Sequence, residues 1–158
     1  MSTPFNTSLR RHPGDPRGLV EQIDALVKER LEEAVEFGCL DLLVQSRRVH
    51  RRPAPEKNSE KDRQEFQALV RELLIYLRGE LREGLTPEDL QKISQAEDAQ
   101  GGQELPRLLA GQTALARMLP DYWQRFETLK TAFTRARLSP PPPRPSLLDR
   151  LFRRARPE

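Results

Sequence analysis

The sequence predicts an all-α protein, a bundle of three to four helices with disordered basic or proline-rich ends and a short amphipathic helix at the C-terminus. Large apolar residues recur every three or four positions through most of residues 18–138, which is the period of one face of a helix. Most of the 14 prolines lie outside these periodic segments. Hydrophobic residues make up only 36% of the chain and charged residues 32%, so we expect a narrow core.

The first predicted helix begins at Gly18. We expect it to reach Phe37, to pause or bend at Gly38, and to resume through Val44. The stretch 46–62 is polar and contains prolines, which is typical of an exposed connection. The apolar stripe that defines this helix comprises Leu19, Val20, Ile23, Leu26, Val27, Leu31, Ala34 and Val35.

A second and a third helix follow this connection. An apolar stripe from Phe66 to Leu81 predicts the second, which should end near Gly84 because glycine accepts the left-handed conformation that closes helices. The run 86–89 (Thr-Pro-Glu-Asp) predicts the start of a third, short helix, since threonine caps helices, proline suits the first helical position and acids suit the first turn. This helix should stop before Gly101.

The last helical pattern runs from about residue 106 to 138. Pro120 should kink or restart it, because an internal proline removes a backbone hydrogen bond and clashes with the preceding turn. The near-heptad spacing of its large side chains also suggests a coiled-coil type of association between copies of the chain. Those side chains are Leu108, Leu115, Leu119, Tyr122, Phe126, Leu129 and Phe133.

These patterns divide the chain into four parts. Residues 1–17 form a flexible basic arm, 18–138 the bundle, 139–145 a proline-rich spacer and 146–158 a docking segment. In the last part an apolar helical face lies among basic side chains, which fits an anionic membrane surface, the groove of a protein partner, or the bundle itself. The face consists of Leu147, Leu148, Leu151 and Phe152, and the basic residues are Arg150, Arg153 and Arg154.

Catalytic, cofactor-binding and metal-binding residues are not predicted. The chain has one cysteine and two histidines, which offer no zinc spacing, and it lacks phosphate-cradling and nucleophile motifs. Cys39 is most simply a small buried hydrophobic residue. A single cysteine and the absence of a leader sequence indicate a cytoplasmic protein.

We therefore expect a non-enzymatic adaptor or regulatory protein that binds a protein partner through the bundle and docks through its C-terminal segment, at a membrane surface or in a partner groove. Tyr122 and Trp123 could form a partner hot spot, although Tyr122 has the spacing of a core residue and Trp123 that of its edge.

The alternative is a small nucleic-acid-binding protein. Four arginines within the run 47–52 could contact phosphates together with the basic ends of the chain. These residues are Arg47, Arg48, Arg51 and Arg52. No aromatic residue interrupts the run to stack on bases, so the pattern is unspecific.

Overall fold

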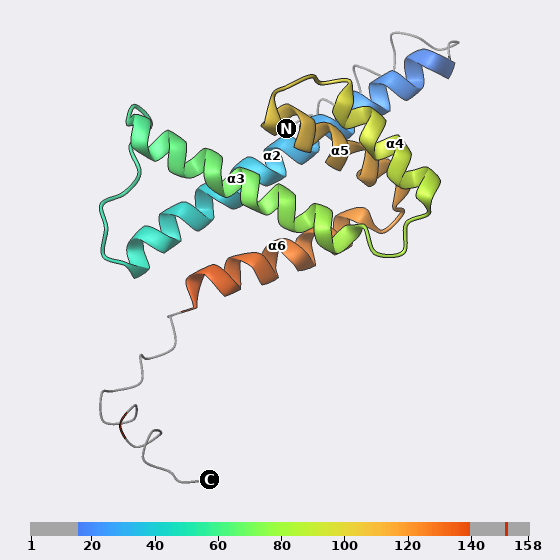
Figure 1. Ribbon diagram of the computed structural model, residues 1–158. Coiled ribbons are helices and arrows are strands. Elements are labelled where there is room, and N and C mark those ends of the chain that lie inside the picture. Colours follow the sequence, from blue (N-terminus) through green and yellow to red (C-terminus); the bar gives the residue numbers. More distant parts are fainter. Residues whose placement is uncertain (1–15, 140–150, 152–158) are drawn as a thin grey trace, which may run out of the picture.

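The computed structural model describes residues 16–139 and Leu151, and every regular element in this part of the chain is a helix (Figure 1). The predicted all-α class is confirmed, with five helices in the described residues in place of three or four. None of them combines the length and the apolar character needed to cross a membrane. They are α2 (Pro16–Val49), α3 (Glu60–Leu81), α4 (Pro87–Asp98), α5 (Glu104–Met118) and α6 (Tyr122–Leu138).

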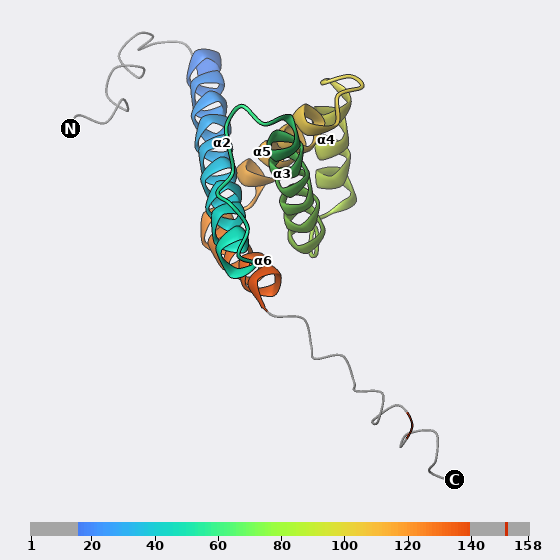
Figure 2. The same ribbon diagram turned by 90° about the vertical axis from the view of Figure 1, so that its left-hand side faces the viewer.

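The long helix α2 organises the other four. It has 34 residues and is therefore about 51 Å long. Helices α3, α4 and α5 all lie on one side of it (Figure 2). Helix α4 packs mainly on α5, and α5 in turn packs on α2 and α3. The α4–α5 pair is thus positioned through α5.

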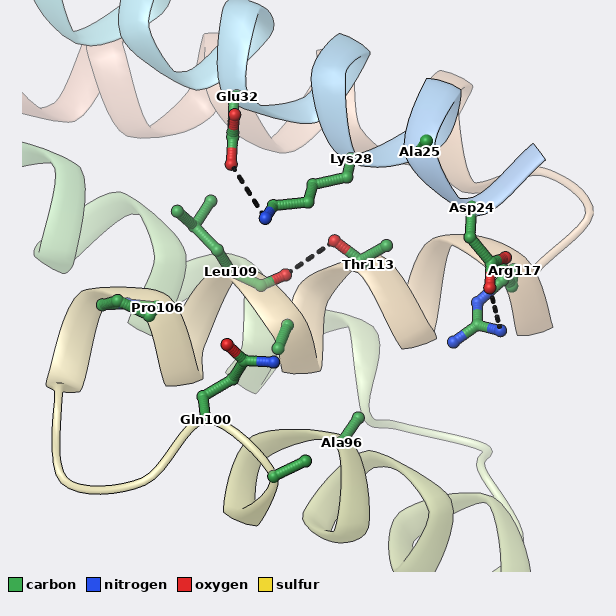
Figure 3. Close-up of a pocket in the computed structure, with 12 residues that line it drawn as sticks. Asp24, Ala25, Lys28, Glu32, Ala96, Gln100, Pro106, Leu109, Thr113 and Arg117 are labelled. Atoms are coloured by element: carbon green, nitrogen blue, oxygen red, sulfur yellow. Dashed lines mark hydrogen bonds and ion pairs between the residues drawn. The ribbon is translucent and has the colours of Figure 1, made fainter. Parts of the chain in front are cut away.

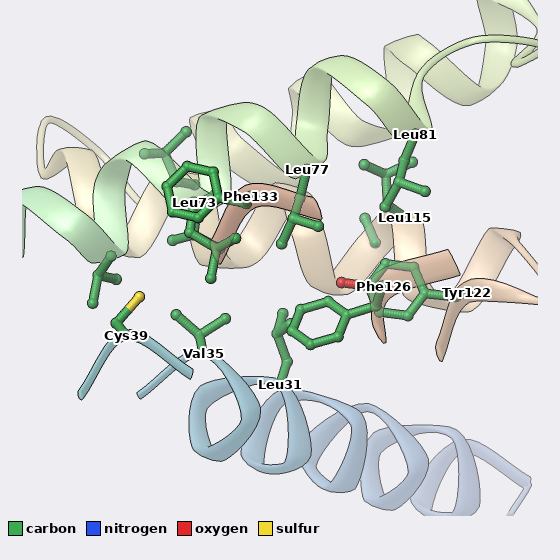
Figure 4. Packing of buried hydrophobic residues seen from close by; sticks show 14 of the residues in the cluster. Leu31, Val35, Cys39, Leu73, Leu77, Leu81, Leu115, Tyr122, Phe126 and Phe133 are labelled. Atoms are coloured by element: carbon green, nitrogen blue, oxygen red, sulfur yellow. The ribbon is translucent and has the colours of Figure 1, made fainter. Parts of the chain in front are cut away.

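The core forms where α2, α3, α5 and α6 meet (Figure 4). The inward face of α2 and the leucine stripe of α3 surround the aromatic rings of α6, and these side chains are almost completely buried. The main contributors are Leu31, Val35 and Cys39 from α2, Leu73, Leu77 and Leu81 from α3, Leu115 from α5, and Tyr122, Phe126 and Phe133 from α6.

The expected pause at Gly38 does not occur, because α2 continues without interruption to Val49. A Cβ atom at Gly38 would lie 2.9 Å from Cδ of Lys130 on α6, which is closer than such atoms normally approach. The glycine therefore permits close packing between two helices and does not end one.

Helix α2 also includes the first arginines of the run 47–52, so the connection to α3 is shorter than the predicted 46–62. The N–H of Arg52 donates to the carbonyl of Arg47 (2.8 Å), and the N–H of Arg51 donates to that of Arg48 (3.1 Å). This pair of bonds is the Schellman motif that closes helices. Arg51 occupies its left-handed position, with φ of 53°.

Replacing Arg51 by glycine should stabilise the protein. A side chain in the left-handed region costs about 1–2 kcal/mol, and part of this gain is lost to the greater freedom of glycine in the unfolded chain. We expect the free energy of unfolding to rise by about 0.5–1 kcal/mol, measured by urea denaturation. A decrease on Arg51→Gly would show that the arginine side chain makes stabilising contacts that outweigh its backbone strain.

The predicted start of the third helix is confirmed. The N–H of Asp89 donates to Oγ1 of Thr86 (3.2 Å), and Pro87 is the first residue of α4. Gly84, in the turn before it, has φ of 87°, the conformation for which glycine was expected there.

Pro120 lies between two separate helices. Of the two predicted effects of this proline, a kink or a restart, the structure shows the restart. Helix α5 ends at Met118, and α6 begins at Tyr122. Leu119 between them is extended, with φ of −101° and ψ of 113°, which is the conformation favoured before a proline. The change in direction lets α6 return along the second half of α2.

Candidate protein-binding surfaces

An open groove of about 430 Å³ lies between α2, α4 and α5 (Figure 3). Half of its twelve lining side chains are alanine, proline or leucine, which leave room for another chain to approach closely. Ala25 comes from α2, Ala96 and Ala99 come from α4 and its C-terminal cap, and Pro106, Leu109 and Ala110 come from α5.

Charged side chains along the groove pair with one another. Nη1 of Arg117 lies 3.2 Å from Oδ2 of Asp24, and Nζ of Lys28 lies 3.8 Å from Oε1 of Glu32. Such solvent-accessible pairs contribute little to stability. Because the charges of each pair cancel, these four side chains give the groove no net charge.

A second hollow of about 280 Å³ adjoins the groove between α2, α3 and α5. Glu32 and Leu109 line both, and Phe66 and Val70 of α3 add apolar surface to the second. Together the two follow α2 from Asp24 to Glu36, a length of about 18 Å. This distance matches roughly three turns of an amphipathic helix.

A part-buried ion pair joins α4, which forms one wall of the groove, to α3. Glu97 of α4 is only 5% exposed, and its Oε2 accepts a hydrogen bond from Nη2 of Arg78 on α3 (2.9 Å). A Cβ atom at Gly111 of α5 would overlap Oε1 of Glu97 and lie 2.8 Å from its Cγ. Gly111 therefore leaves the space that this carboxylate occupies between α4 and α5.

The sequence pattern does not predict this arrangement. Glu97 lies in a polar stretch and has the pattern of a solvated acid. The signal that could have found it is Gly111, a glycine inside an otherwise helical apolar segment, because such a glycine often marks a close approach.

Arg47, predicted as an anion contact, joins two helices. Its side chain is buried, and its Nη2 lies 2.6 Å from Oδ1 of Asp62 and 2.7 Å from Oε2 of Glu65. Nη1 donates to the carbonyl of Pro53 (3.3 Å). The end of α2 is thereby fixed to the first turns of α3.

The other arginines of the run differ in their surroundings. Arg52 is exposed, with Nη1 at 3.4 Å from Oε1 of Glu65. Arg48 and Arg51 are exposed and form no ion pair within residues 16–139. Arg47 and Arg52 therefore face carboxylates of α3, whereas Arg48 and Arg51 do not.

The stability that the contact between Arg47 of α2 and Asp62 of α3 contributes depends on pH. The hydrogen bond from Arg47, helped by the N–H of Glu56 (2.8 Å), holds the pKa of Asp62 below its ordinary value. A carboxyl group of this kind stabilises the fold fully above its ordinary pKa of about 4, and the contribution is lost as the pH falls through the lowered value.

We expect Asp62→Asn to make the melting temperature of the protein less dependent on pH in the acidic range. The melting temperature of the wild type should fall more steeply than that of the variant between about pH 4 and pH 2. Asp41→Asn, at an exposed position of α2, is the control and should follow the wild type. Parallel curves for wild type and Asp62→Asn would contradict the lowered pKa.

The two aromatic residues predicted as a hot spot occupy different environments. Tyr122 is 1% exposed, and its hydroxyl oxygen accepts a hydrogen bond from Nε2 of Gln112 (2.8 Å). Burial raises the pKa of Tyr122. Trp123 is half-buried at the edge of the core, and the guanidinium carbon of Arg30 lies 4.1 Å from its ring centroid. Only Trp123 of the two therefore reaches the surface.

Most of the predicted docking segment lies outside the described residues. Leu151 is described, and it is helical and 63% exposed. The residues of this prediction that lie outside are Leu147, Leu148, Arg150, Phe152, Arg153 and Arg154.

Cys39 has the environment of a core residue. Its side chain is 0% exposed, and burial raises the pKa of the thiol to about 12, so it remains protonated and unreactive near neutral pH. Within the described part of the chain, no group of three or more metal-ligating side chains is arranged to hold an ion.

In comparisons with known proteins, no family model matches this chain, and no curated protein or solved structure shows significant similarity to it.

Proposed function

We propose that this protein is a non-enzymatic adaptor or regulatory protein. Its bundle binds an amphipathic segment of a protein partner in the groove between α2, α4 and α5, and residues 146–158 dock the complex to an anionic membrane surface or to a groove on a partner. The observation that supports the proposal best is the groove itself, which exposes alanine, proline and leucine surface between three helices beside mutually paired charges.

The size of the groove suggests weak, reversible binding. Each large apolar side chain that a partner buries there contributes about 1.5–3 kcal/mol. Two or three such side chains must offset the loss of translational freedom and the ordering of the segment. We therefore expect a dissociation constant in the micromolar range.

The proposal is tested by filling the groove. Ala25 is exposed on α2 and lines the groove, so Ala25→Trp should block a ligand without disturbing the core. Ala136→Trp makes the same change at an exposed position of α6 and is the control. In quantitative affinity isolation from cells, a partner bound by the wild type and by Ala136→Trp should be lost with Ala25→Trp. Equal recovery with all three proteins would contradict a role for the groove.

The docking segment requires a separate test. Co-sedimentation of the full chain with anionic and neutral vesicles should show binding that depends on anionic lipid and weakens at high salt. Leu151→Asp combined with Phe152→Asp should abolish it. Absence of binding by the wild type would exclude the membrane and leave a protein groove as the target of this segment.

A further inference from the structure

Helix α2 has a second apolar face, which lies opposite its core-facing stripe. Phe37 is 72% exposed and Leu40 is 47% exposed, and nearer the start of the helix Leu19 and Ile23 are 45% and 46% exposed. Leu26 and Val44 complete this face and are half-buried. Helices α3 and α5 pack on the other side of α2, with α4 held there by α5 (Figure 2), while α6 reaches the edge of the outer face through Trp123. The outer face of α2 thus carries two exposed apolar groups of side chains, one on each side of the charged residues Arg30 and Glu33.

The residues of this outer face are spaced alternately four and three positions apart, the interval of a helix that packs along another helix. Their order also reads the same from both ends, with three apolar residues, a pair of opposite charges at the centre, and three apolar residues again. The complete set is Leu19, Ile23, Leu26, Arg30, Glu33, Phe37, Leu40 and Val44.

We infer that this outer face binds the same face of a second copy of the chain, with the two α2 helices antiparallel about a two-fold axis. A two-fold interface must be complementary to itself, so that each contact occurs twice. If the axis passes between Leu31 and Glu32, Arg30 of each copy lies opposite Glu33 of the other. The same operation places Leu26 opposite Phe37.

The two outer apolar pairs follow from the same axis. Ile23 lies opposite Leu40 of the second copy, and Leu19 lies opposite Val44. A parallel arrangement would instead bring Arg30 against Arg30 and Glu33 against Glu33, and this repulsion disfavours it. The charge pattern therefore selects the antiparallel direction.

The two central charges are available for this contact. Arg30 is exposed and stacks on Trp123, with its guanidinium carbon 4.1 Å from the ring centroid. Stacking uses the flat face of the guanidinium and leaves its N–H edges free to meet a carboxylate. Glu33 is exposed and forms no ion pair with any described residue. Trp123 then lies beside the two-fold axis, where a half-buried tryptophan can act as an anchor.

The dimer would have a consequence for docking. It places both bundles on the outside and leaves one groove and one C-terminal segment on each subunit. Two linked segments on one particle bind a surface far more tightly than either alone. The dimer does not depend on the proposed groove, and either could exist without the other.

The first test is the mass of the full chain in solution, measured by analytical ultracentrifugation over a range of concentrations. The wild type should be a dimer that dissociates in the micromolar range or below. Phe37→Asp with Leu40→Asp should give a folded monomer, since both positions are exposed. Ile75→Asp, at a 47% exposed apolar position of α3, is the control and should remain dimeric. A wild type that is monomeric up to about 100 μM would overturn the inference.

Charge reversal tests the central pair. Glu33→Arg places arginine opposite arginine twice and should weaken the dimer about tenfold or more. The double variant Arg30→Glu with Glu33→Arg restores opposite charges and should recover most of that loss. If the double variant is as weak as Glu33→Arg alone, Arg30 and Glu33 do not face each other and the inference fails.

Engineered cysteines test the direction of the helices. In the antiparallel dimer, a mixture of Leu26→Cys chains and Phe37→Cys chains should form a disulfide between the two variants. Leu26→Cys chains alone should not, because their thiols are offset by about 16 Å along the helix, too far for a disulfide. Buried Cys39 should not react. Efficient cross-linking of Leu26→Cys to itself would indicate parallel helices and overturn the proposed axis.

Discussion

Replacement of Phe126 by alanine is expected to lower the free energy of unfolding by about 3–5 kcal/mol, the cost typical of removing a fully buried phenylalanine side chain. The ring is 0% exposed. Its centroid lies 6.0 Å from that of Tyr122 and 5.7 Å from that of Trp123. Because α6 joins the core mainly through its aromatic side chains, the cavity should loosen α6 from α2 and α3.

The matched control is the same substitution on the outer face of α2. Phe37 is 72% exposed, so Phe37→Ala should change the stability of the monomer by no more than about 0.5 kcal/mol. Both variants should be measured by urea denaturation at low protein concentration, where a dimer would contribute little. If Phe37→Ala costs as much as Phe126→Ala under these conditions, the outer face is covered within the monomer.

Gly111→Ala is the second substitution with a large expected effect. The new methyl group would occupy the space of the Glu97 carboxylate and force it away from Arg78. Overpacking costs about 1–3 kcal/mol, and breaking a buried ion pair costs about 3–5 kcal/mol. The higher helix propensity of alanine offsets about 1 kcal/mol, and movement of the carboxylate relieves part of the strain. We expect a net loss of about 2–4 kcal/mol.

A double-mutant cycle separates the clash from a general effect on α5. In Glu97→Ala the carboxylate is absent, so adding Gly111→Ala should cost far less than it does in the wild type. The two substitutions should therefore be non-additive by about 1–3 kcal/mol. Additive losses would show that Gly111 has another role. Because Glu97 joins α4 to Arg78 of α3 and lies against Gly111 of α5, Gly111→Ala should also weaken binding in the groove.

The sequence predicts well what depends on neighbouring residues. The apolar period indicates helices, the threonine and proline at 86–87 predict the start of α4, and Pro120 separates α5 from α6. Each of these signals acts within one or two turns of the chain. Gly38 lies inside α2 and faces the side chain of Lys130 on α6, and periodicity within α2 gives no information about that neighbour.

The candidate surfaces were less predictable for the same reason. The groove combines alanines from α2, α4 and α5, and no local pattern marks them. The arginine run looks uniform in the sequence, yet Arg47 is buried between Asp62 and Glu65 while Arg48 is exposed. Which side chain points inward is decided by the position of α3, and this position is a property of the whole bundle.

The most direct test of the proposed function is photo-cross-linking in living cells, with a photoreactive amino acid placed at Ala25 in the groove or at Ala136 on α6. We expect a discrete adduct with another protein from position 25 and little or none from position 136. The mass of the adduct distinguishes a different protein from a second copy of the chain. Adducts of equal yield from both positions, or an adduct from position 136 alone, would contradict a partner-binding groove between α2, α4 and α5.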